Sequence, residues 1–151
     1  MTAAAAAQPV SFRASRRVEF VDTDMAGIVH YSNFFRYMEA AEVDFLQSRG
    51  LSVALPWRDK KLGLPRVSAQ CDFLRPAYFE DILDIDVTLK NVGRKSISYG
   101  FEISRAGELL ARGQVTCVCC LVLGPRKIES IEIPEEIRAL LLGPGTAAKS
   151  S

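Results

Sequence analysis

The residues best suited to chemistry lie between positions 21 and 37, in the segment VDTDMAGIVHYSNFFRY. Asp24 stands seven positions before Tyr31, and Ala26 and Gly27 between them allow the chain to turn tightly. A long helix is predicted to begin at Tyr31. The Asp24 carboxylate can therefore face the start of that helix, with room for a reacting carbonyl group between them.

The start of a helix offers backbone N–H groups that have no acceptor within the helix, and the helix dipole adds positive potential there. Such groups stabilise the oxyanion that forms when a thioester carbonyl is attacked. Tyr31, Ser32 and Asn33 would supply them. Asp24 can attack the acyl carbon itself, giving an anhydride that water cleaves, or it can deprotonate an attacking water. The sequence leaves both routes open.

These residues also have plainer interpretations. Aspartates near helix starts very often cap turns, and the spacing alone favours that role for the DTD triplet. Asp22 is expected to order the loop or pair with an arginine rather than react. Asn33 suits a helix cap as well as a substrate contact. His30, the only histidine, can position water, bind substrate or pack at an interface.

One long amphipathic helix is predicted from Tyr31 to Arg49. Its apolar residues recur at helical spacing, and they are Phe34, Met38, Ala41 and Phe45, widened by Tyr31, Phe35 and Leu46. Ser32 or Asn33 can cap its start, and Gly50 can end it. The helix thus begins where the candidate chemistry lies.

Elsewhere apolar residues alternate with period two, which is typical of half-buried strands. Four segments show this pattern: residues 67–73, 83–89, 97–103 and 111–121. Ala106 and Gly107 form a short turn between the last two, which makes those strands antiparallel neighbours. A first strand is predicted over residues 12–21, and a short helix begins near Pro134, a residue favoured in a first helical turn.

These elements predict one α+β domain over residues 11–142, with residues 1–10 and 143–151 as disordered tails. The helix must bury its apolar stripe, so a five- or six-stranded antiparallel sheet should curl around it. Such a unit leaves the sheet edges and the far side of the helix poorly covered. We therefore expect a homodimer or homotetramer.

Composition and charge narrow the possible partners. The 19 basic and 18 acidic residues leave a net charge of +1, which gives no broad electrostatic surface for nucleic acid or an anionic membrane. No apolar run approaches the roughly 20 residues that cross a bilayer. We predict a cytoplasmic protein. Residues 1–18 contain alanines, serines and arginines but no acid, which also fits an organelle transit peptide, but the arginines already belong to a strand-like segment.

The cysteines do not indicate a metal site. The four of them, Cys71, Cys117, Cys119 and Cys120, lack CxxC spacing, and three fall within an apolar strand pattern. With a single histidine in the chain, metal ligands would have to come from scattered carboxylates and strand cysteines. We predict reduced, buried thiols and no metal.

The segment DTDMAGIVHYSNFFRYMEAAEVDFL resembles the signature of the 4-hydroxybenzoyl-coenzyme A type of hot-dog thioesterases. The matching elements are Asp22, Asp24, Gly27, Val29, Tyr31, Asn33 and the aromatic helix that follows. A weaker resemblance continues through CDFLRPAYFEDILDIDVTLKNVGRKSISYGFEI, so that it covers most of residues 12–124. It implies the hot-dog fold, which agrees with the element order predicted independently.

The resemblance also implies an activity, the hydrolysis of an acyl-CoA thioester. Asp24 would be the nucleophile or general base, and the amide of Tyr31 would polarise the thioester carbonyl. Coenzyme A is part of the substrate, so no cofactor is expected. Another branch of these enzymes has its carboxylate on the long helix, but we interpret Glu39 and Glu42 as charges on the helix face.

Coenzyme A carries phosphates, which need a local basic site. Lys90, Arg94 and Lys95 cluster around the turn at residues 91–95 and are candidates for substrate binding, as are His30 and Asn33. The sequence by itself slightly favours the plainer interpretation of these three cations as a solvated hairpin tip.

Two other functions stay open. The first is a hot-dog enoyl-CoA hydratase, whose family signature resembles D-x-N-P-x-H. In this sequence the spacing from Asp24 to His30 is one residue longer than in that signature, and the Asn-Pro pair is missing. A non-catalytic acyl-binding or scaffold protein would keep the fold without the chemistry. The acid at position 24 favours an enzyme.

Overall fold

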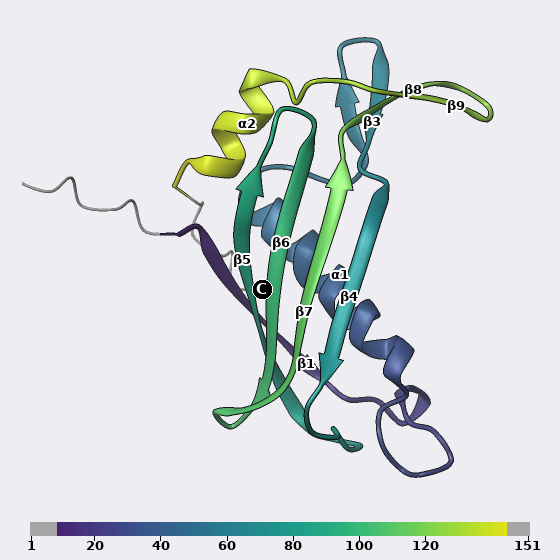
Figure 1. Ribbon diagram of the computed structural model, residues 1–151, viewed down its shortest axis with the longest axis vertical. Helices are drawn as coiled ribbons and strands as arrows, with labels where there is room; N and C mark the ends of the chain where they lie inside the picture. Colours follow the sequence, from purple (N-terminus) through teal and green to yellow (C-terminus); the bar gives the residue numbers. More distant parts are fainter. Residues whose placement is uncertain (1–8, 145–151) are drawn as a thin grey trace, which may run out of the picture.

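The computed structural model describes residues 9–144, and its centre is one long helix held by an antiparallel sheet (Figure 1). Helix α1 (Tyr31–Ser48) lies against a five-stranded sheet of order β1-β5-β6-β7-β4. The strands are β1 (Ser11–Arg17), β4 (Arg66–Phe73), β5 (Ile82–Val92), β6 (Ser96–Arg105) and β7 (Glu108–Val118). This arrangement confirms the predicted α+β fold with a sheet wrapped around a helix.

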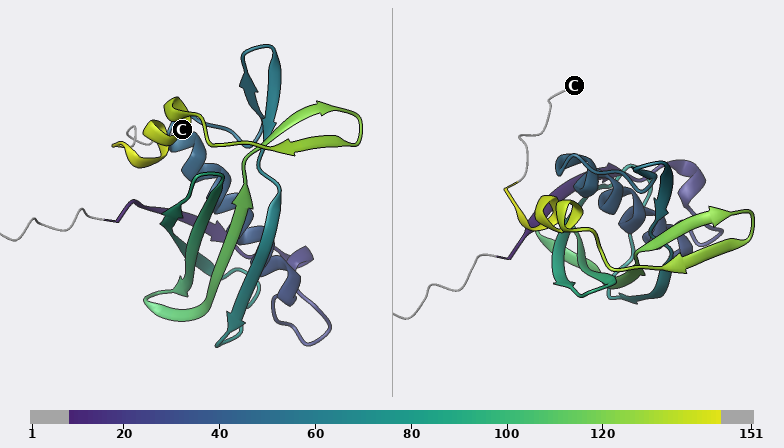
Figure 2. Two further views of the ribbon diagram at one scale, coloured as in Figure 1. Left: turned by 45° about the horizontal axis from the view of Figure 1, so that its top comes forward. Right: turned by 90° about the horizontal axis from the view of Figure 1, so that it is seen from above.

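A second, four-stranded sheet was not predicted. Its order is β2-β3-β8-β9, and its strands are β2 (Leu55–Trp57), β3 (Lys60–Gly63), β8 (Cys120–Gly124) and β9 (Lys127–Ser130). Two hairpins of this sheet project beyond the main sheet (Figure 2). The apolar alternation of β7 continues into β8, so the sequence indicated one strand. The chain changes sheets at Cys119, whose N–H donates to the carbonyl of Lys95 at 2.7 Å.

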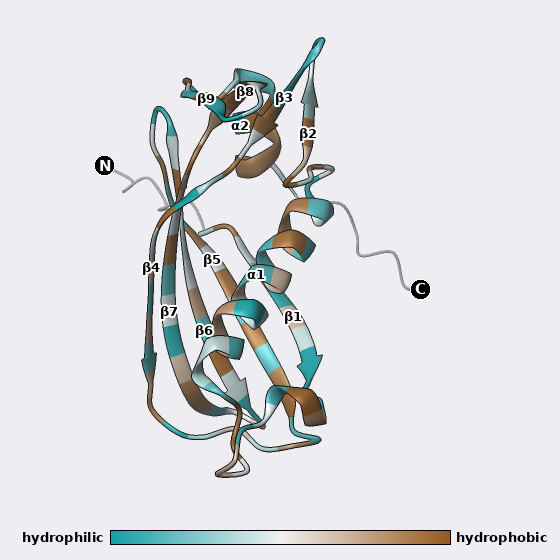
Figure 3. Cartoon of the chain, turned by 90° about the vertical axis from the view of Figure 1, so that its right-hand side faces the viewer, coloured by the Kyte–Doolittle hydropathy of each residue, from teal (hydrophilic) through white to brown (hydrophobic). Residues whose placement is uncertain are grey.

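The core lies between α1 and one face of the main sheet. The residues of β5 and β6 that were predicted to face the helix are buried, and Figure 3 shows the apolar stripe of α1 against that face. Gly113 lets the helix approach β7 closely, because a Cβ there would lie 2.3 Å from the sulfur of Met38. Short helix α2 (Glu135–Leu142) begins after Pro134, as predicted, and neither helix among residues 9–144 is long and apolar enough to cross a bilayer.

The structure corrects several predicted boundaries. Helix α1 is capped by His30, whose ring accepts from the Ser32 amide, and not by Ser32 or Asn33. The first strand ends at Arg17, and residues 20–22 form a short 3-10 helix instead. Of the predicted tails, only residues 9–10 and 143–144 lie within the described residues, and Val10 accepts a hydrogen bond from the Leu89 amide at 2.9 Å.

Strand β4 is less buried than its alternation predicted. The exposed fractions of Val67 and Phe73 are 62% and 46%, although the Phe73 ring contacts Phe34 of α1. β4 is the last strand of the sheet, and α1 makes fewer contacts with it than with β1 or β5. A period of two therefore identified the strand correctly but could not tell that its apolar face is open.

The prediction for Glu42, that it is a charge on the helix face, is also wrong. Its exposed fraction is 1%, and its carboxylate bonds to the guanidinium of Arg66 at 2.7 Å. The second carboxylate oxygen, Oε1, has no hydrogen-bond partner among the described residues. A buried ion pair of this kind ties α1 to the edge strand β4 but costs desolvation energy.

Stability should depend on pH through Glu42. Burial raises the pKa of its carboxyl above the ordinary value of 4.5, although Arg66 opposes this shift. A carboxyl with a raised pKa in the folded state stabilises the fold at low pH, and that contribution is lost as the pH rises through the raised value. We expect the unfolding free energy, measured in urea relative to Glu42→Gln, to be lower at pH 8 than at pH 5. A difference that does not vary with pH would contradict this.

Candidate active site

The loop before α1 forms a small closed turn around Asp24. Thr23 and Val29 make an antiparallel bridge, and within it the Asp24 amide donates to the carbonyl of Ile28 at 2.9 Å. Gly27 has a φ of +79°, a left-handed conformation that favours glycine, and its amide donates a hydrogen bond to the Asp24 carbonyl at 3.0 Å. The loop therefore has a fixed shape that does not depend on its exposed tip, Met25.

The Asp24 side chain is half-buried and held at one oxygen only. Oδ1 accepts a hydrogen bond from the Ala26 amide at 2.8 Å. Oδ2 receives no hydrogen bond from any residue in the range 9–144. Asp24 lines a cleft of about 490 Å³ together with Tyr31, Phe34, Phe73 and Arg75, among others. One carboxylate oxygen is thus anchored while the other is available to react.

Of the three backbone amides predicted to stabilise an oxyanion, only one lacks a hydrogen-bond acceptor among the described residues. The Ser32 amide donates to Nδ1 of His30 at 3.3 Å, and the Asn33 amide donates to the His30 carbonyl at 2.9 Å. The Tyr31 amide has no acceptor within the part of the chain that the structure describes. Since Tyr31 also lines the cleft with Asp24, the structure brings together the two residues predicted to carry the chemistry.

Aromatic side chains form the wall of the cleft. The Phe73 ring lies edge-on to Phe34 at 5.3 Å and to Tyr31 at 6.2 Å between ring centroids. Phe73 and Arg75 were not predicted as site residues. The alternation of β4 placed Phe73 in the core, and only the fold reveals that this strand end opens into the cleft.

Asp22 and Asn33 fasten the loop to the helix. The Asp22 carbonyl accepts from the His30 amide at 2.9 Å and from the side-chain amide of Asn33 at 2.8 Å. Its carboxylate accepts from the Glu19 amide at 3.0 Å and from the hydroxyl of Tyr37 at 2.9 Å. Burial and the neighbouring carboxylate raise the pKa of the Tyr37 phenol, so it stays protonated and donates. Asp22 orders the loop, as predicted.

His30 makes contacts at the helix start and is not one of the residues that line the cleft. Its Nδ1 lies 2.8 Å from the Ser32 hydroxyl, and its ring lies beside that of Tyr31, with 4.8 Å between centroids. Because Nδ1 accepts from the Ser32 amide, the proton of the neutral ring is on Nε2. Substrate binding by His30 and Asn33 stays a prediction.

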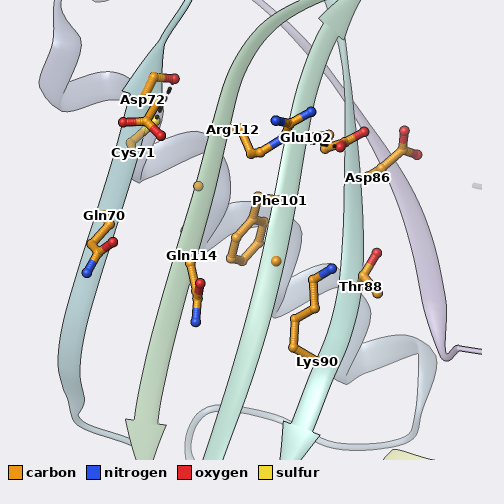
Figure 4. A pocket seen from close by; sticks show the side chains of 12 residues that line it. Gln70, Cys71, Asp72, Asp86, Thr88, Lys90, Phe101, Glu102, Arg112 and Gln114 are labelled. Atoms are coloured by element: carbon orange, nitrogen blue, oxygen red, sulfur yellow. Dashed lines mark hydrogen bonds and ion pairs between the residues drawn. The ribbon is translucent and has the colours of Figure 1, made fainter.

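The three predicted basic residues lie away from Asp24 within one chain. The turn with Arg94 and Lys95 follows β5, whereas the Asp24 loop is near the start of β5, where the Val18 amide donates to the Asp81 carbonyl. The 11 residues of β5 separate the two ends by roughly 35 Å. Lys90 lies on the outer face of the sheet, where its side chain covers Gly100 beside Thr88 and Gln114 (Figure 4).

Comparison with known proteins gives consistent results. Residues 18–141 match the thioesterase-like superfamily. The chain is 31% identical over 136 residues to 4-hydroxybenzoyl-CoA thioesterase from Pseudomonas sp. (strain CBS-3), covering 83% of this chain and 94% of that one. It is 34% identical over 119 residues to 1,4-dihydroxy-2-naphthoyl-CoA hydrolase from Synechocystis sp. (strain ATCC 27184 / PCC 6803 / Kazusa), covering 78% and 86%.

The fold agrees with a solved structure as well. The solved structure of 4-hydroxybenzoyl-CoA thioesterase from Pseudomonas sp. strain CBS-3 superposes on this chain with a TM-score of 0.75 and is 30% identical to it in sequence. The match covers 86% of this chain and 98% of that chain. The family match over residues 18–141 includes the DTD loop, α1 and strands β2 to β9.

Two buried tyrosines provide a matched test of the loop anchor. Tyr37→Phe removes the hydroxyl that donates to Asp22, whereas Tyr99→Phe removes a buried hydroxyl that has no partner among the described residues. We expect the first to lower the unfolding free energy by about 1 kcal/mol and the second to leave it within about 0.5 kcal/mol or raise it. Chemical denaturation measures both. Equal losses would show that the Tyr37–Asp22 bond contributes nothing.

Proposed function

Because the chain belongs to the thioesterase-like superfamily and has the hot-dog fold, we propose that it hydrolyses an acyl-CoA thioester to a carboxylic acid and CoA. The observation that carries this proposal is that one cleft is lined by Asp24, whose carboxylate keeps one oxygen without a hydrogen bond, and by Tyr31, whose helix-start amide has no acceptor among the described residues. Asp24 and Tyr31 are the catalytic residues. The superfamily match supports the reaction class, and the geometry supports the residue roles.

The reaction begins with the thioester carbonyl oxygen at the Tyr31 amide. On one route, Asp24 attacks the acyl carbon, the C–S bond breaks, and water then cleaves the acyl–aspartyl anhydride. On the other route, Asp24 removes a proton from water, the hydroxide adds to the carbon, and the expelled thiolate takes that proton back. In both, the amide and the helix dipole stabilise the negative charge on oxygen.

The acyl group is proposed to be aromatic. The rings of Phe34, Phe73 and Tyr31 form the wall of the cleft, and a flat acyl group can pack against them edge-on or offset. Two relatives are a 4-hydroxybenzoyl-CoA thioesterase and a 1,4-dihydroxy-2-naphthoyl-CoA hydrolase. Their substrates have one and two fused rings, which fits a cleft of about 490 Å³.

The active protein is proposed to be a homodimer that pairs through β4. This edge strand has eight residues, and it exposes both apolar side chains and unpaired backbone groups. A two-fold axis would pair β4 with its copy in antiparallel fashion and place the Arg66 end of one beside the Phe73 end of the other.

Such pairing would also bring phosphate-binding residues to the cleft. Arg66 pairs with Cys117, and Cys117 with Ile97, so the start of β4 is level with the basic turn before β6. The basic turn of the second copy would then be near the cleft of the first. On this proposal, Lys90, Arg94 and Lys95 bind the phosphates of the substrate in the partner's cleft. This explains why they lie far from Asp24 of their own chain. A cytoplasmic location stays a prediction of the sequence.

Removing the reactive charge should abolish hydrolysis. Asp24→Asn keeps the size and the hydrogen bond of the side chain but cannot act as nucleophile or base, so we expect turnover of aromatic acyl-CoA esters to fall roughly 10²–10⁴-fold. Thiol release measures the rate, and a parallel assay for alkene hydration tests the hydratase alternative. The control is Glu39→Gln on the exposed face of α1. Near-normal turnover by Asp24→Asn would refute its assignment.

The dimer can be tested at the strand edge. We expect the protein to elute from a sizing column at twice or four times its chain mass of 16.6 kDa. Val67→Glu places a charge on the open face of β4 and should shift elution toward the monomer. Val122→Glu, an exposed valine of the other sheet, is the control. A monomeric parent protein, or equal behaviour of the two variants, would rule out pairing through β4.

A further inference from the structure

The turn between β5 and β6 is held from outside at four consecutive carbonyl oxygens. Arg138 of α2 donates to the carbonyls of Val92 at 3.2 Å and Gly93 at 2.7 Å. The Ile133 amide donates to the Arg94 carbonyl at 2.8 Å, and the Cys119 amide donates to that of Lys95 at 2.7 Å. The backbone of the turn is therefore fixed by Arg138 and Ile133 of the C-terminal segment together with Cys119, and its basic side chains stay at the surface.

A carboxylate lies among these cations. Glu132, one residue before Ile133, forms a hydrogen-bonded ion pair with the guanidinium of Arg94. The hydrogen bond and charge of Arg94 lower the pKa of Glu132, and the charges of Lys95 and Arg138 lower it further. Glu132 is thus an anion held in a field of three positive charges.

The Arg94–Glu132 pair is easy to replace. The exposed fractions of the two side chains are 84% and 62%, and ion pairs in such surroundings stabilise a protein very little. A phosphate monoester has three acceptor oxygens and nearly two negative charges, so it makes more charge-assisted hydrogen bonds with Arg94 and Lys95 than one carboxylate does. The position that Glu132 occupies is therefore one that a phosphate can take.

We propose that Glu132 is an internal competitor for the phosphate site formed by Arg94 and Lys95, and that it limits the affinity of the protein for the phosphate-bearing end of its substrate. The inference rests on the proposed function, because the phosphates concerned are those of a CoA thioester. Binding displaces the Glu132 carboxylate from Arg94, and no covalent bond changes. Glu132 then determines how strongly the protein distinguishes a CoA thioester from a thioester without phosphates.

The test compares two substrates in matched variants. We expect Glu132→Gln to lower KM for an aromatic acyl-CoA about two- to fivefold, while KM for the corresponding pantetheine thioester, which has no phosphate, changes less. The effect should disappear in an Arg94→Gln background, because Glu132 then has no site to occupy. Glu129→Gln on β9 removes the same charge nearby and is the control, since Glu129 forms no ion pair with any described residue.

A direct binding measurement separates this inference from the proposed function. Adenosine 3′,5′-bisphosphate carries phosphates and no thioester, so calorimetric titration tests the phosphate site even if no thioester is hydrolysed. Tighter binding by Glu132→Gln than by the parent protein and by Glu129→Gln supports the inference. Equal affinities of the three proteins would overturn it, as would an equal fall in KM for the CoA and pantetheine thioesters.

Discussion

The attachment of the Asp24 loop to the first turn of α1, through Asp22, is the interaction on which the site depends. Asp22 uses its carbonyl to hold His30 and Asn33 and its carboxylate to hold Glu19 and Tyr37. These bonds fix a flexible connection against a rigid helix. Asp24, two residues further on, is then held on the same side as the helix start, and its position needs no contact with substrate. Preorganisation of this kind is what electrostatic stabilisation of an oxyanion requires.

The second constraint is that one helix cannot cover five strands. Helix α1 makes most of its contacts with β1 and β5, Met38 lies over Gly113 of β7, and the edge strand β4 is left partly open on its apolar side. The cleft lies at this open side, with Phe73 at the end of β4 as part of its wall. The exposed strand edge and the reactive cleft are therefore consequences of the same mismatch between helix and sheet width. A second copy that covers the edge would complete both.

The sequence predicted the elements well and their surroundings less well. Period-two and helical spacing located α1 and the five strands of the main sheet, because each pattern is local. The open face of β4, the burial of Glu42 and the second sheet depend on which elements are neighbours, and spacing has no information on that. In the cleft, the pairing of Asp24 with Tyr31 followed from a short loop. The contributions of Phe73, at the end of β4, and of Arg75, just after it, come from more than 40 residues away in the chain and needed the fold.

Met25 takes part in none of the hydrogen bonds that shape the Asp24 loop among the described residues, although residues on both sides of it do. Its side chain is completely exposed at the tip, and it lines a shallow hollow that contains none of the aromatic residues of the cleft wall. The reactive carboxylate is thus insulated from the residue next to it. The side chain at position 25 can therefore change without altering the backbone that positions the reactive carboxylate.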